Sequence, residues 1–418
     1  MSAAASYFLD LVYSLTNCMS CFPGSPQLRI NNKSFKILRL LGEGGFSYVY
    51  LVQDTSTSTL YALKKIRCPF GQESVSQALK EVEAYSLFAP HPNIIRAIDH
   101  SVESDKSDPG AKTVYILLPY YRRGNLQDMI NANLVNHTSF PERRLMVLFL
   151  GVCRALKAMH HYRVKKGPGG EASERKARGV RREAAKADRE AGEEVEMNMG
   201  KRRQRSPRGE AAGDDVELEQ EPLMEGEVMR SQEGVKAGEE RAYAHRDIKP
   251  GNIMISDDGQ TPILMDLGSL APAPTPITSR SLALQVQDQA AEHSTMPYRA
   301  PELFDVKTGS TIDTKVDIWS LGCTLYACLV GKSPFEARSE ETGGSLSLCV
   351  LGGDWRFPDE APARGKQKAK PEEGITPAVK DVVRRCLRVE PVERPDVDEL
   401  ISLVEEVIEG LPQDGGAE

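Results

Sequence analysis

Three side chains suited to magnesium-assisted phosphoryl transfer occur close together in this sequence. Asp247 and Asn252 lie in the run His-Arg-Asp-Ile-Lys-Pro-Gly-Asn, and Asp266 opens the run Asp-Leu-Gly shortly after it. Carboxylate and amide oxygens are ligands that Mg²⁺ prefers, and the ion keeps further positions for water and phosphate. With Asn252 and Asp266 on a metal, Asp247 is free to accept a proton from an incoming hydroxyl. This residue set is typical of metal-assisted phosphoryl transfer.

A β-hairpin is expected between these residues. Ile253–Ser256 and Pro262–Met265 are apolar and β-prone, and residues 257–260 have turn chemistry. Because a hairpin returns the chain to its start, Asn252 and Asp266 should lie side by side.

A glycine-rich turn upstream is a candidate phosphate cradle. Glycine lets backbone N–H groups approach phosphates because it has no Cβ. Lys64, at the end of the strand-like run 60–64, would point one positive charge at such phosphates, and the helix-like stretch Val75–Phe88 carries Glu81 as its partner. Taken singly, both charges also fit solvated surface positions. The turn is formed by Gly42, Glu43, Gly44, Gly45, Phe46 and Ser47.

Further motifs follow in a fixed order, and with them the chain resembles the eukaryotic protein kinases over about residues 35–408, apart from one insertion. The narrower resemblance, carried by the glycine turn, by 265–269 and by 284–302, is to the Numb-associated kinase family and its serine/threonine kinase 16 branch of lipid-anchored Golgi and vacuolar kinases. The additional motifs are His91-Pro92-Asn93, Ala300-Pro301-Glu302, Asp317-x-Trp319-Ser320-x-Gly322 and Arg394-Pro395.

The resemblance implies roles for individual residues, with ATP and Mg²⁺ as cofactors and proteins as substrates. Asp247 would be the catalytic base and Lys249 would neutralise the transferring phosphoryl group. Asn252 and Asp266 would hold the metal, while Lys64 would bind the α- and β-phosphates and pair with Glu81. The adenine pocket would be built from Val49, Ala62, the hinge residue Tyr121, the gatekeeper Leu118 and Met254.

The implied fold is α+β, with a β-rich N-lobe over about 35–118 and a mostly helical C-lobe over about 120–410. Residues 1–34 would form a leader and 411–418 a tail. Residues 165–241 interrupt the C-lobe and are rich in charged residues, Ala and Gly. Such a composition cannot bury enough apolar surface to offset ordering entropy, so we expect a disordered insertion. Its basic knot 201–205 is compatible with a nuclear signal, a phospholipid contact or a merely solvated loop.

Charge, hydropathy and cysteine spacing argue against a nucleic-acid-binding, membrane-spanning or cysteine-ligated metal protein. The net charge of −7 gives no sign of a nucleic-acid-binding surface. No apolar run reaches the roughly 20 residues of a membrane-spanning helix. The six internal cysteines have no metal-ligand spacing and indicate reduced thiols of a cytosolic protein.

Several departures and special positions stand out against the family pattern. Ser47 replaces the third loop glycine, and Leu267 replaces the usual phenylalanine without an expected loss of activity. Residues 281–293 are expected to form a helix inside the segment that precedes Glu302. That helix would hold the segment open without phosphorylation, although Arg246 is also available to bind a phosphate. Glu302 with Arg394 would form a buried ion pair, and Asp317 would accept backbone hydrogen bonds from the catalytic loop.

The leader is expected to attach the protein to the cytosolic face of Golgi or vacuolar membranes. Ser2 excludes N-myristoylation, but Cys18 and Cys21 flank the short apolar stretch Tyr7–Leu15. Two acyl chains give stable membrane attachment where one is marginal, so S-acylation of both cysteines is the hypothesis. The alternative is a frayed tail with two idle thiols.

The expected activity is that of a non-specific serine/threonine protein kinase, favoured by Lys249 and by Thr295 ahead of the Ala-Pro-Glu motif. A pseudokinase scaffold is the alternative, yet such proteins usually lack one of the catalytic residues, all of which are present here. A small-molecule phosphotransferase would lack the Ala300–Glu302 segment.

Overall fold

The computed structural model describes residues 27–44, 47–69, 72–104, 111–164, 239–360 and 374–413. Two compact units are present, residues 1–162 with 241–418 and residues 163–240. The second unit is described only at its two ends. Cys18, Cys21, Gly45, Phe46 and nearly all of the expected insertion lie outside the described residues.

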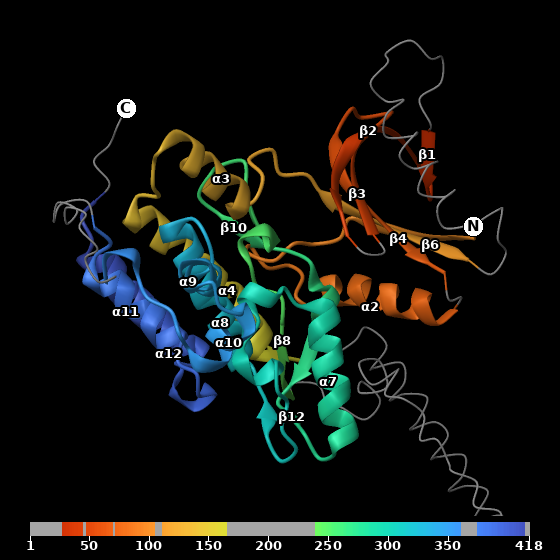
Figure 1. The fold of residues 1–418 in the computed structure, drawn as a ribbon. Helices are drawn as coiled ribbons and strands as arrows, with labels where there is room; N and C mark the ends of the chain where they lie inside the picture. Colours follow the sequence, from red (N-terminus) through yellow and green to blue (C-terminus); the bar gives the residue numbers. More distant parts are fainter. Residues whose placement is uncertain are drawn as a thin grey trace, which may run out of the picture. The chain divides into compact units, whose positions relative to one another are not determined.

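A six-stranded antiparallel sheet of order β1-β2-β3-β4-β6-β5 forms the N-lobe, with α2 packed against β4 and β6 (Figure 1). Alternate residues of β6 point to opposite faces. Val114, Ile116 and Leu118 join the core shared with α2, whereas Leu117 packs with Phe35 on the other face. The elements are β1 (Gln27–Ile30), β2 (Lys33–Glu43), β3 (Ser47–Asp54), β4 (Leu60–Cys68), α2 (Gln72–Leu87), β5 (Asp99–Ser104) and β6 (Lys112–Pro119).

The sheet begins earlier than the boundary at residue 35 that the sequence indicated. β1 pairs with β2, in a register that sets Gln27 opposite Lys36 and Ile30 opposite Lys33. Ile30 is fully buried beside Phe35. Residues 27–34 therefore belong to the sheet, because an apolar strand too short to stand out in the sequence completes its core.

Helices form most of the C-lobe. They pack in pairs, with α12 against α4 and α11 against α8. The helices are α3 (Leu126–Asn136), α4 (Glu142–His160), α7 (Arg280–His293), α8 (Lys315–Val330), α9 (Pro334–Thr342), α10 (Leu346–Gly352), α11 (Pro377–Cys386) and α12 (Val397–Gly410). Short 3-10 turns occur at η2 (Pro250–Asn252), η3 (Leu267–Ser269), η4 (Met296–Tyr298), η5 (Pro301–Leu303), η6 (Pro358–Glu360) and η8 (Pro391–Glu393).

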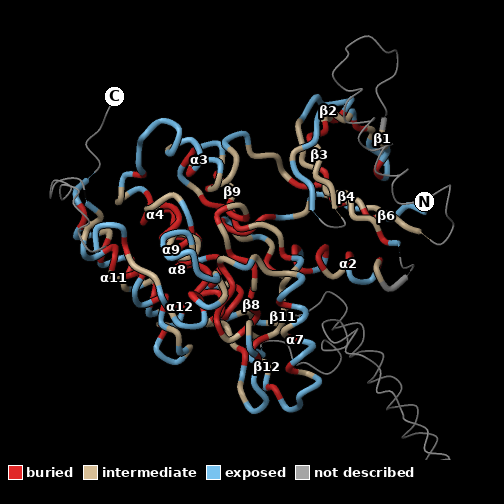
Figure 2. The backbone as a smooth tube through the Cα atoms, viewed as in Figure 1, coloured by how far each residue is buried: buried red, intermediate tan, exposed pale blue. Residues whose placement is uncertain are grey.

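The helix α8 lies at the centre of this lobe. Its residues Val316 to Cys328 are all buried, as expected for a helix that is apolar on every side, and Figure 2 shows this region in red. α4 instead buries one face and meets β10 through Gly151. A Cβ at Gly151 would lie 2.5 Å from a ring carbon of Pro262, so the backbones of helix and strand approach as closely as glycine allows.

The expected hairpin is present. β9 (Ile253–Ile255) pairs with β10 (Pro262–Leu264), and Met254 lies opposite Ile263. The expected helices over 75–88 and 281–293 correspond to α2 and α7, within three residues at each end. The remaining strands are β7 (Tyr162–Arg163), β8 (Glu240–Ala244), β11 (Ala271–Ala273), β12 (Thr275–Pro276) and β13 (Thr311–Ile312), of which β8 pairs with β11 and β12 with β13.

Candidate active site

Lys64 joins the N-lobe sheet both to helix α2 and to Asp266, the first residue of the loop 266–269, which we call the metal loop. Its Nζ lies 2.8 and 3.0 Å from the two carboxylate oxygens of Glu81, on α2, and 2.9 Å from Asp266 Oδ1. The pairing of Lys64 with Glu81 that the sequence predicted is therefore present. It also places α2 close against β4, in the position needed to bring all three charges together.

The charges of Lys64, Glu81 and Asp266 shift the pKa values of Lys64 and Asp266. Burial alone would lower the pKa of Lys64, but the carboxylates of Glu81 and Asp266 outweigh it and raise that pKa above its usual value. Burial would likewise raise the pKa of Asp266, yet the charge of Lys64 and its hydrogen bond hold it below its usual value. Lys64 is thus a cation and Asp266 an anion across the physiological pH range.

In the catalytic loop, residues 245–252, the buried carboxylate of Asp247 accepts several hydrogen bonds. Its Oδ2 accepts from Lys249 Nζ at 2.8 Å and from Asn252 Nδ2 at 3.0 Å. Its Oδ1 accepts from the backbone N–H of Thr295 at 2.9 Å and from the Thr295 hydroxyl at 2.8 Å. Lys249 also reaches the Thr295 hydroxyl at 2.7 Å. The carboxylate is thereby held in one orientation by both the loop and the segment that follows α7.

Asn252 and Asp266 lie side by side at the open end of the hairpin, as the sequence predicted. The backbone N–H of Met265 donates to Asn252 O at 2.9 Å. Within the described parts of the chain, no hydrogen bond uses Asn252 Oδ1 or Asp266 Oδ2, and no group of three acidic, His or Cys side chains gathers elsewhere to hold a metal. Two free oxygen donors fit Mg²⁺, which takes few protein ligands and completes its shell with water and phosphate.

The glycine turn joins β2 to β3. The N–H of Gly44 donates to Ser47 O at 2.8 Å, so the described ends of the turn approach each other. A Cβ added at Gly42 would meet nothing within 4 Å, which shows open space on this side of the sheet. Gly45 and Phe46 lie outside the described residues, and the rest of the turn keeps its place between β2 and β3.

The residues expected at the adenine lie on adjoining strands. Val49 faces Lys64 across β3 and β4, and Ala62 faces Leu118 across β4 and β6. Leu118 is buried, whereas Ala62, Tyr121 and Met254 are partly buried against the main core. The flat adenine ring binds against apolar surface. Partly buried side chains suit it because they leave such surface exposed.

Sequence reasoning missed two contributors. Tyr85, one turn after Glu81 on α2, donates its hydroxyl to Glu81 Oε1 at 2.6 Å. The spacing of four residues on a helix could have predicted this contact. Arg299 also went unnoticed, since nothing in the pattern of the sequence shows that its side chain reaches the end of α7.

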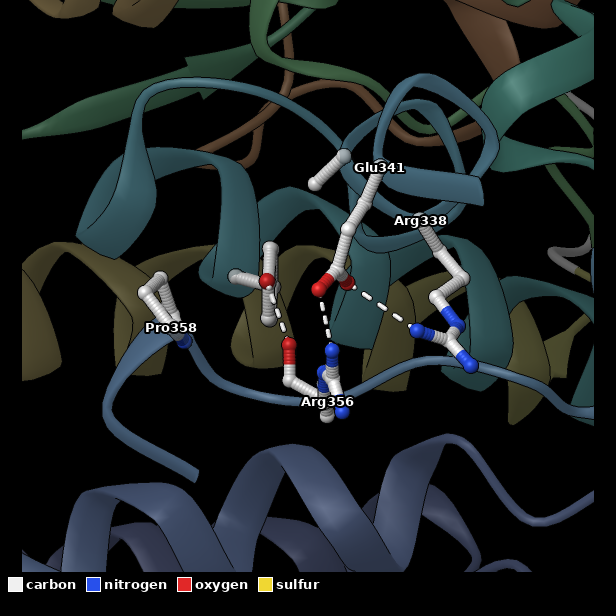
Figure 3. A pocket seen from close by; sticks show the side chains of 6 residues that line it. Arg338, Glu341, Arg356 and Pro358 are labelled. Atoms are coloured by element: carbon white, nitrogen blue, oxygen red, sulfur yellow. Dashed lines mark hydrogen bonds and ion pairs between the residues drawn. The ribbon is translucent and has the colours of Figure 1, made fainter. Parts of the chain in front are cut away.

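A cavity of about 250 Å³ lies away from this set, between α9 and the segment before η6 (Figure 3). Arg338 and Arg356 both donate to Glu341 there, and Arg338 also binds Asp354 at 2.8 Å. Its charges therefore have partners within the cavity wall. None of the residues expected to carry chemistry lines it, so we assign this cavity no part in catalysis.

Comparison with known proteins agrees with the geometry. Residues 35–165 and 228–403 match the protein kinase domain. The chain belongs to the protein kinase family. Among similar proteins, serine/threonine-protein kinase ENV7 of Saccharomyces cerevisiae is 34% identical over 411 residues, covering 96% of this chain and 99% of that protein. Serine/threonine-protein kinase ppk13 of Schizosaccharomyces pombe is 32% identical, with 90% and 91% covered. Serine/threonine-protein kinase 16 of Rattus norvegicus is 30% identical, with the same coverage.

This kinase is accordingly a serine/threonine protein kinase with the two-lobed fold, as the sequence predicted. The match extends through the glycine turn, the catalytic loop and the metal loop. Among the described helices, none is both long and apolar enough to cross a membrane.

Proposed function

We propose that this kinase transfers the γ-phosphoryl group of ATP to protein Ser and Thr hydroxyls, with Asp247 as the catalytic base. Lys249 neutralises charge on the moving phosphoryl group, and Lys64, aligned by Glu81, binds the nucleotide phosphates. Asn252 and Asp266 would hold Mg²⁺, which supplies a Lewis acid that neutralises phosphate charge when bound. Phosphoryl transfer needs mainly such positioning and charge stabilisation.

One observation carries this proposal: a hydroxyl already lies between the proposed base and the proposed cation. Thr295 Oγ1 is 2.8 Å from Asp247 Oδ1 and 2.7 Å from Lys249 Nζ. A carboxylate oxygen and an ammonium group that share one hydroxyl define a place where alcohols are recognised. An acceptor hydroxyl entering beside Thr295 would meet a proton acceptor and a cation together, which is the arrangement the transfer requires.

The base assignment is tested with Asp247→Asn, which keeps the size of the side chain but removes the negative charge. We expect the turnover number with a generic protein substrate to fall by about 10²–10⁴-fold, the usual contribution of a general base. Binding of Mg-ATP should change little, because Asp247 contacts neither Lys64 nor Asp266 and meets Asn252 through Nδ2, which leaves Asn252 Oδ1 free for the metal. The matched control is Asp381→Asn, a half-exposed carboxylate on α11 that pairs with Arg385 at 2.7 Å.

Two results would count against the proposal. Equal turnover by Asp247→Asn and wild type would remove Asp247 from the reaction. A wild-type protein that binds Mg-ATP but phosphorylates nothing would favour the pseudokinase scaffold. Asp266→Ala separates the metal role, because it should weaken binding of Mg-ATP as well as turnover.

The finer placement rests on resemblance to particular relatives. Similarity to serine/threonine-protein kinase 16 over 90% of this chain supports the serine/threonine kinase 16 branch and, with it, the Numb-associated family. We place the kinase domain at about 35–410 with an insertion at 165–241 and a tail at 411–418, the sheet itself starting at Gln27. Acylation of Cys18 and Cys21 would attach it to the cytosolic face of Golgi or vacuolar membranes, for a role in membrane trafficking.

A further inference from the structure

The C-terminal end of α7 is bound by side chains from two functional loops. The last four carbonyls of a helix have no partner within it. Here the Ser269 hydroxyl, in the metal loop, donates to His293 O at 2.7 Å. Arg299, in the segment after η4, donates to Ala291 O at 3.3 Å. α7, drawn in teal in Figure 1, is thus tied to both loops at the end nearest the catalytic residues.

Arg299 makes two further hydrogen bonds to Ser294, the residue that follows the last residue of α7. Its Nε donates to Ser294 Oγ at 2.7 Å and its Nη2 to Ser294 O at 3.0 Å. The guanidinium also lies 4.9 Å from the ring centre of Phe304, and the residue as a whole is buried. A cation at a helix C-terminus is favoured by the helix dipole, and the planar fork of arginine allows several bonds from one rigid group.

One peptide group connects Arg299 to the proposed base. The carbonyl of Ser294 and the N–H of Thr295 belong to the same planar unit, which barely bends. Its oxygen accepts from Arg299 Nη2 at 3.0 Å, and its N–H donates to Asp247 Oδ1 at 2.9 Å. A change in the position of the guanidinium therefore changes the direction of the N–H that orients Asp247.

We propose that Arg299 is a positioning residue for Asp247 and acts through the peptide group between Ser294 and Thr295. This inference rests on the proposed role of Asp247. Ser269 ties the same end of α7 to the metal loop. The helix therefore fixes the positions of the proposed metal site and the proposed acceptor site relative to each other. Because Arg299 Nε and Nη2 already bind oxygens of the chain, this orientation needs no phosphate on the segment between Asp266 and Glu302.

Arg246 offers the competing explanation. Its Nε is buried and has no hydrogen-bond partner among the described residues. A phosphate on the segment that follows the metal loop could bind there and order the acceptor site instead. The two explanations differ in what they predict for a fully dephosphorylated enzyme.

The test compares Arg299→Lys and Arg299→Gln with wild type in steady-state phosphorylation of one peptide. The lysine keeps the charge but cannot bond Ser294 Oγ, Ser294 O and Ala291 O at once. We expect both variants to lose up to roughly 10²-fold in kcat, as for a displaced catalytic group. KM for ATP should stay unchanged, because none of the hydrogen bonds of Arg299 reaches Lys64 or Asp266. Arg385→Lys, on the exposed face of α11, is the control.

A second measurement keeps the result clear if a variant is unstable. Hydrogen exchange should quicken for peptides that contain the Thr295 N–H in Arg299→Lys, at a temperature where the variant is folded. Ser294→Ala alone should lower kcat, and combined with Arg299→Lys it should add little, because both variants lose the bond from Arg299 Nε to Ser294 Oγ. Additive effects, or full turnover in Arg299→Lys, would overturn the proposal.

Phosphatase treatment of wild type completes the test. Retained kcat supports positioning by Arg299, whereas a loss as large as that of Arg299→Lys assigns the task to Arg246 and a phosphate. Failure of the proposed function would look different, since wild type and all variants would then phosphorylate nothing.

Discussion

Asp317 holds Arg246 in a backbone conformation that non-glycine residues rarely adopt. Asp317 Oδ1 accepts the Arg246 N–H at 2.8 Å, and Arg246 has a φ of 68°. The other carboxylate oxygen accepts the His245 N–H at 2.8 Å and approaches His160 Nε2 at 3.0 Å. A fully buried residue of α8 thus fixes the turn of the catalytic loop just before Asp247, as the sequence predicted.

Asp317→Asn should therefore lower both stability and turnover. The amide keeps one acceptor but presents a donor to the second backbone N–H, and each hydrogen bond to a charged group contributes roughly 1.5–3 kcal/mol. Urea unfolding measures the loss, with Asp381→Asn as a half-exposed control. A variant as stable as wild type would show that the loop holds its own turn.

The difference in stability between wild type and Asp317→Asn should depend on pH. Burial would raise the pKa of Asp317, but its hydrogen bond and charge interaction with His160 hold that pKa below its usual value. A carboxylate with a lowered pKa stabilises the fold above its ordinary pKa, and this contribution is lost as pH falls through the lowered value. The gap in melting temperature between wild type and Asp317→Asn should be constant near neutrality and shrink below about pH 4. A gap that widens in acid would contradict this assignment.

Glu302 and Arg394 should behave as one unit in stability measurements. Their bidentate pair has distances of 2.6 and 2.8 Å, and the Arg394 side chain is completely buried beneath Trp319. Removing one member leaves a buried charge unpaired, which costs about 3–5 kcal/mol. We expect Glu302→Ala and Arg394→Ala each to lose stability, and the double variant to lose much less than their sum. Strict additivity in urea unfolding would show that the pair is not coupled.

The insertion should be removable without damage to the fold. The N–H of Val164 donates to Glu239 O at 3.0 Å, so the two residues that flank 165–238 are already neighbours. We expect a Gly/Ser bridge in place of residues 165–238 to leave the melting temperature within a few degrees and the turnover intact. Two variants whose bridges differ twofold in length should differ in free energy of unfolding by only about 0.6 kcal/mol, because the cost of loop closure grows with the logarithm of length. Loss of solubility or activity with both bridges would reveal a packing or gating role.

Cys18 and Cys21 give a prediction outside the described residues. If both are S-acylated, Cys18→Ser/Cys21→Ser should move the kinase from the membrane to the soluble fraction, because two acyl chains are needed for stable attachment. Hydroxylamine-sensitive acyl label should disappear with it. Ser20→Ala, between the two thiols, is the control. Equal membrane fractions with no label on wild type would leave them as idle thiols.

Local chemistry let the sequence predict much of this site. The apolar runs and polar turn between Asn252 and Asp266 define a hairpin by themselves, and amphipathic spacing defines α2 and α7. The Asp317 and Glu302–Arg394 contacts followed from the family resemblance alone.

What the sequence could not provide depends on packing. The short strand β1 is recognisable only once Ile30 is seen beside Phe35. The bonds from Arg299 to the end of α7 also need the folded chain, since neither helix periodicity nor motif spacing tells where a long side chain ends. Lys64 and Asp266, 202 residues apart, meet for the same reason.

The contact at Gly151 determines which part of the active site can move. The hairpin that carries Asp266 rests directly on the backbone of α4, and Asn93 Nδ2 fastens it further through Pro262 O at 2.9 Å. Asn252 and Asp266, at the two ends of that hairpin, therefore share one support, and Asn252 Nδ2 ties Asp247 to it at 3.0 Å. Lys64, on β4 of the sheet, reaches this group of residues through Asp266 Oδ1 at 2.9 Å. The proposed proton acceptor and the proposed metal ligands can thus keep their mutual positions when the contact between Lys64 and Asp266 opens.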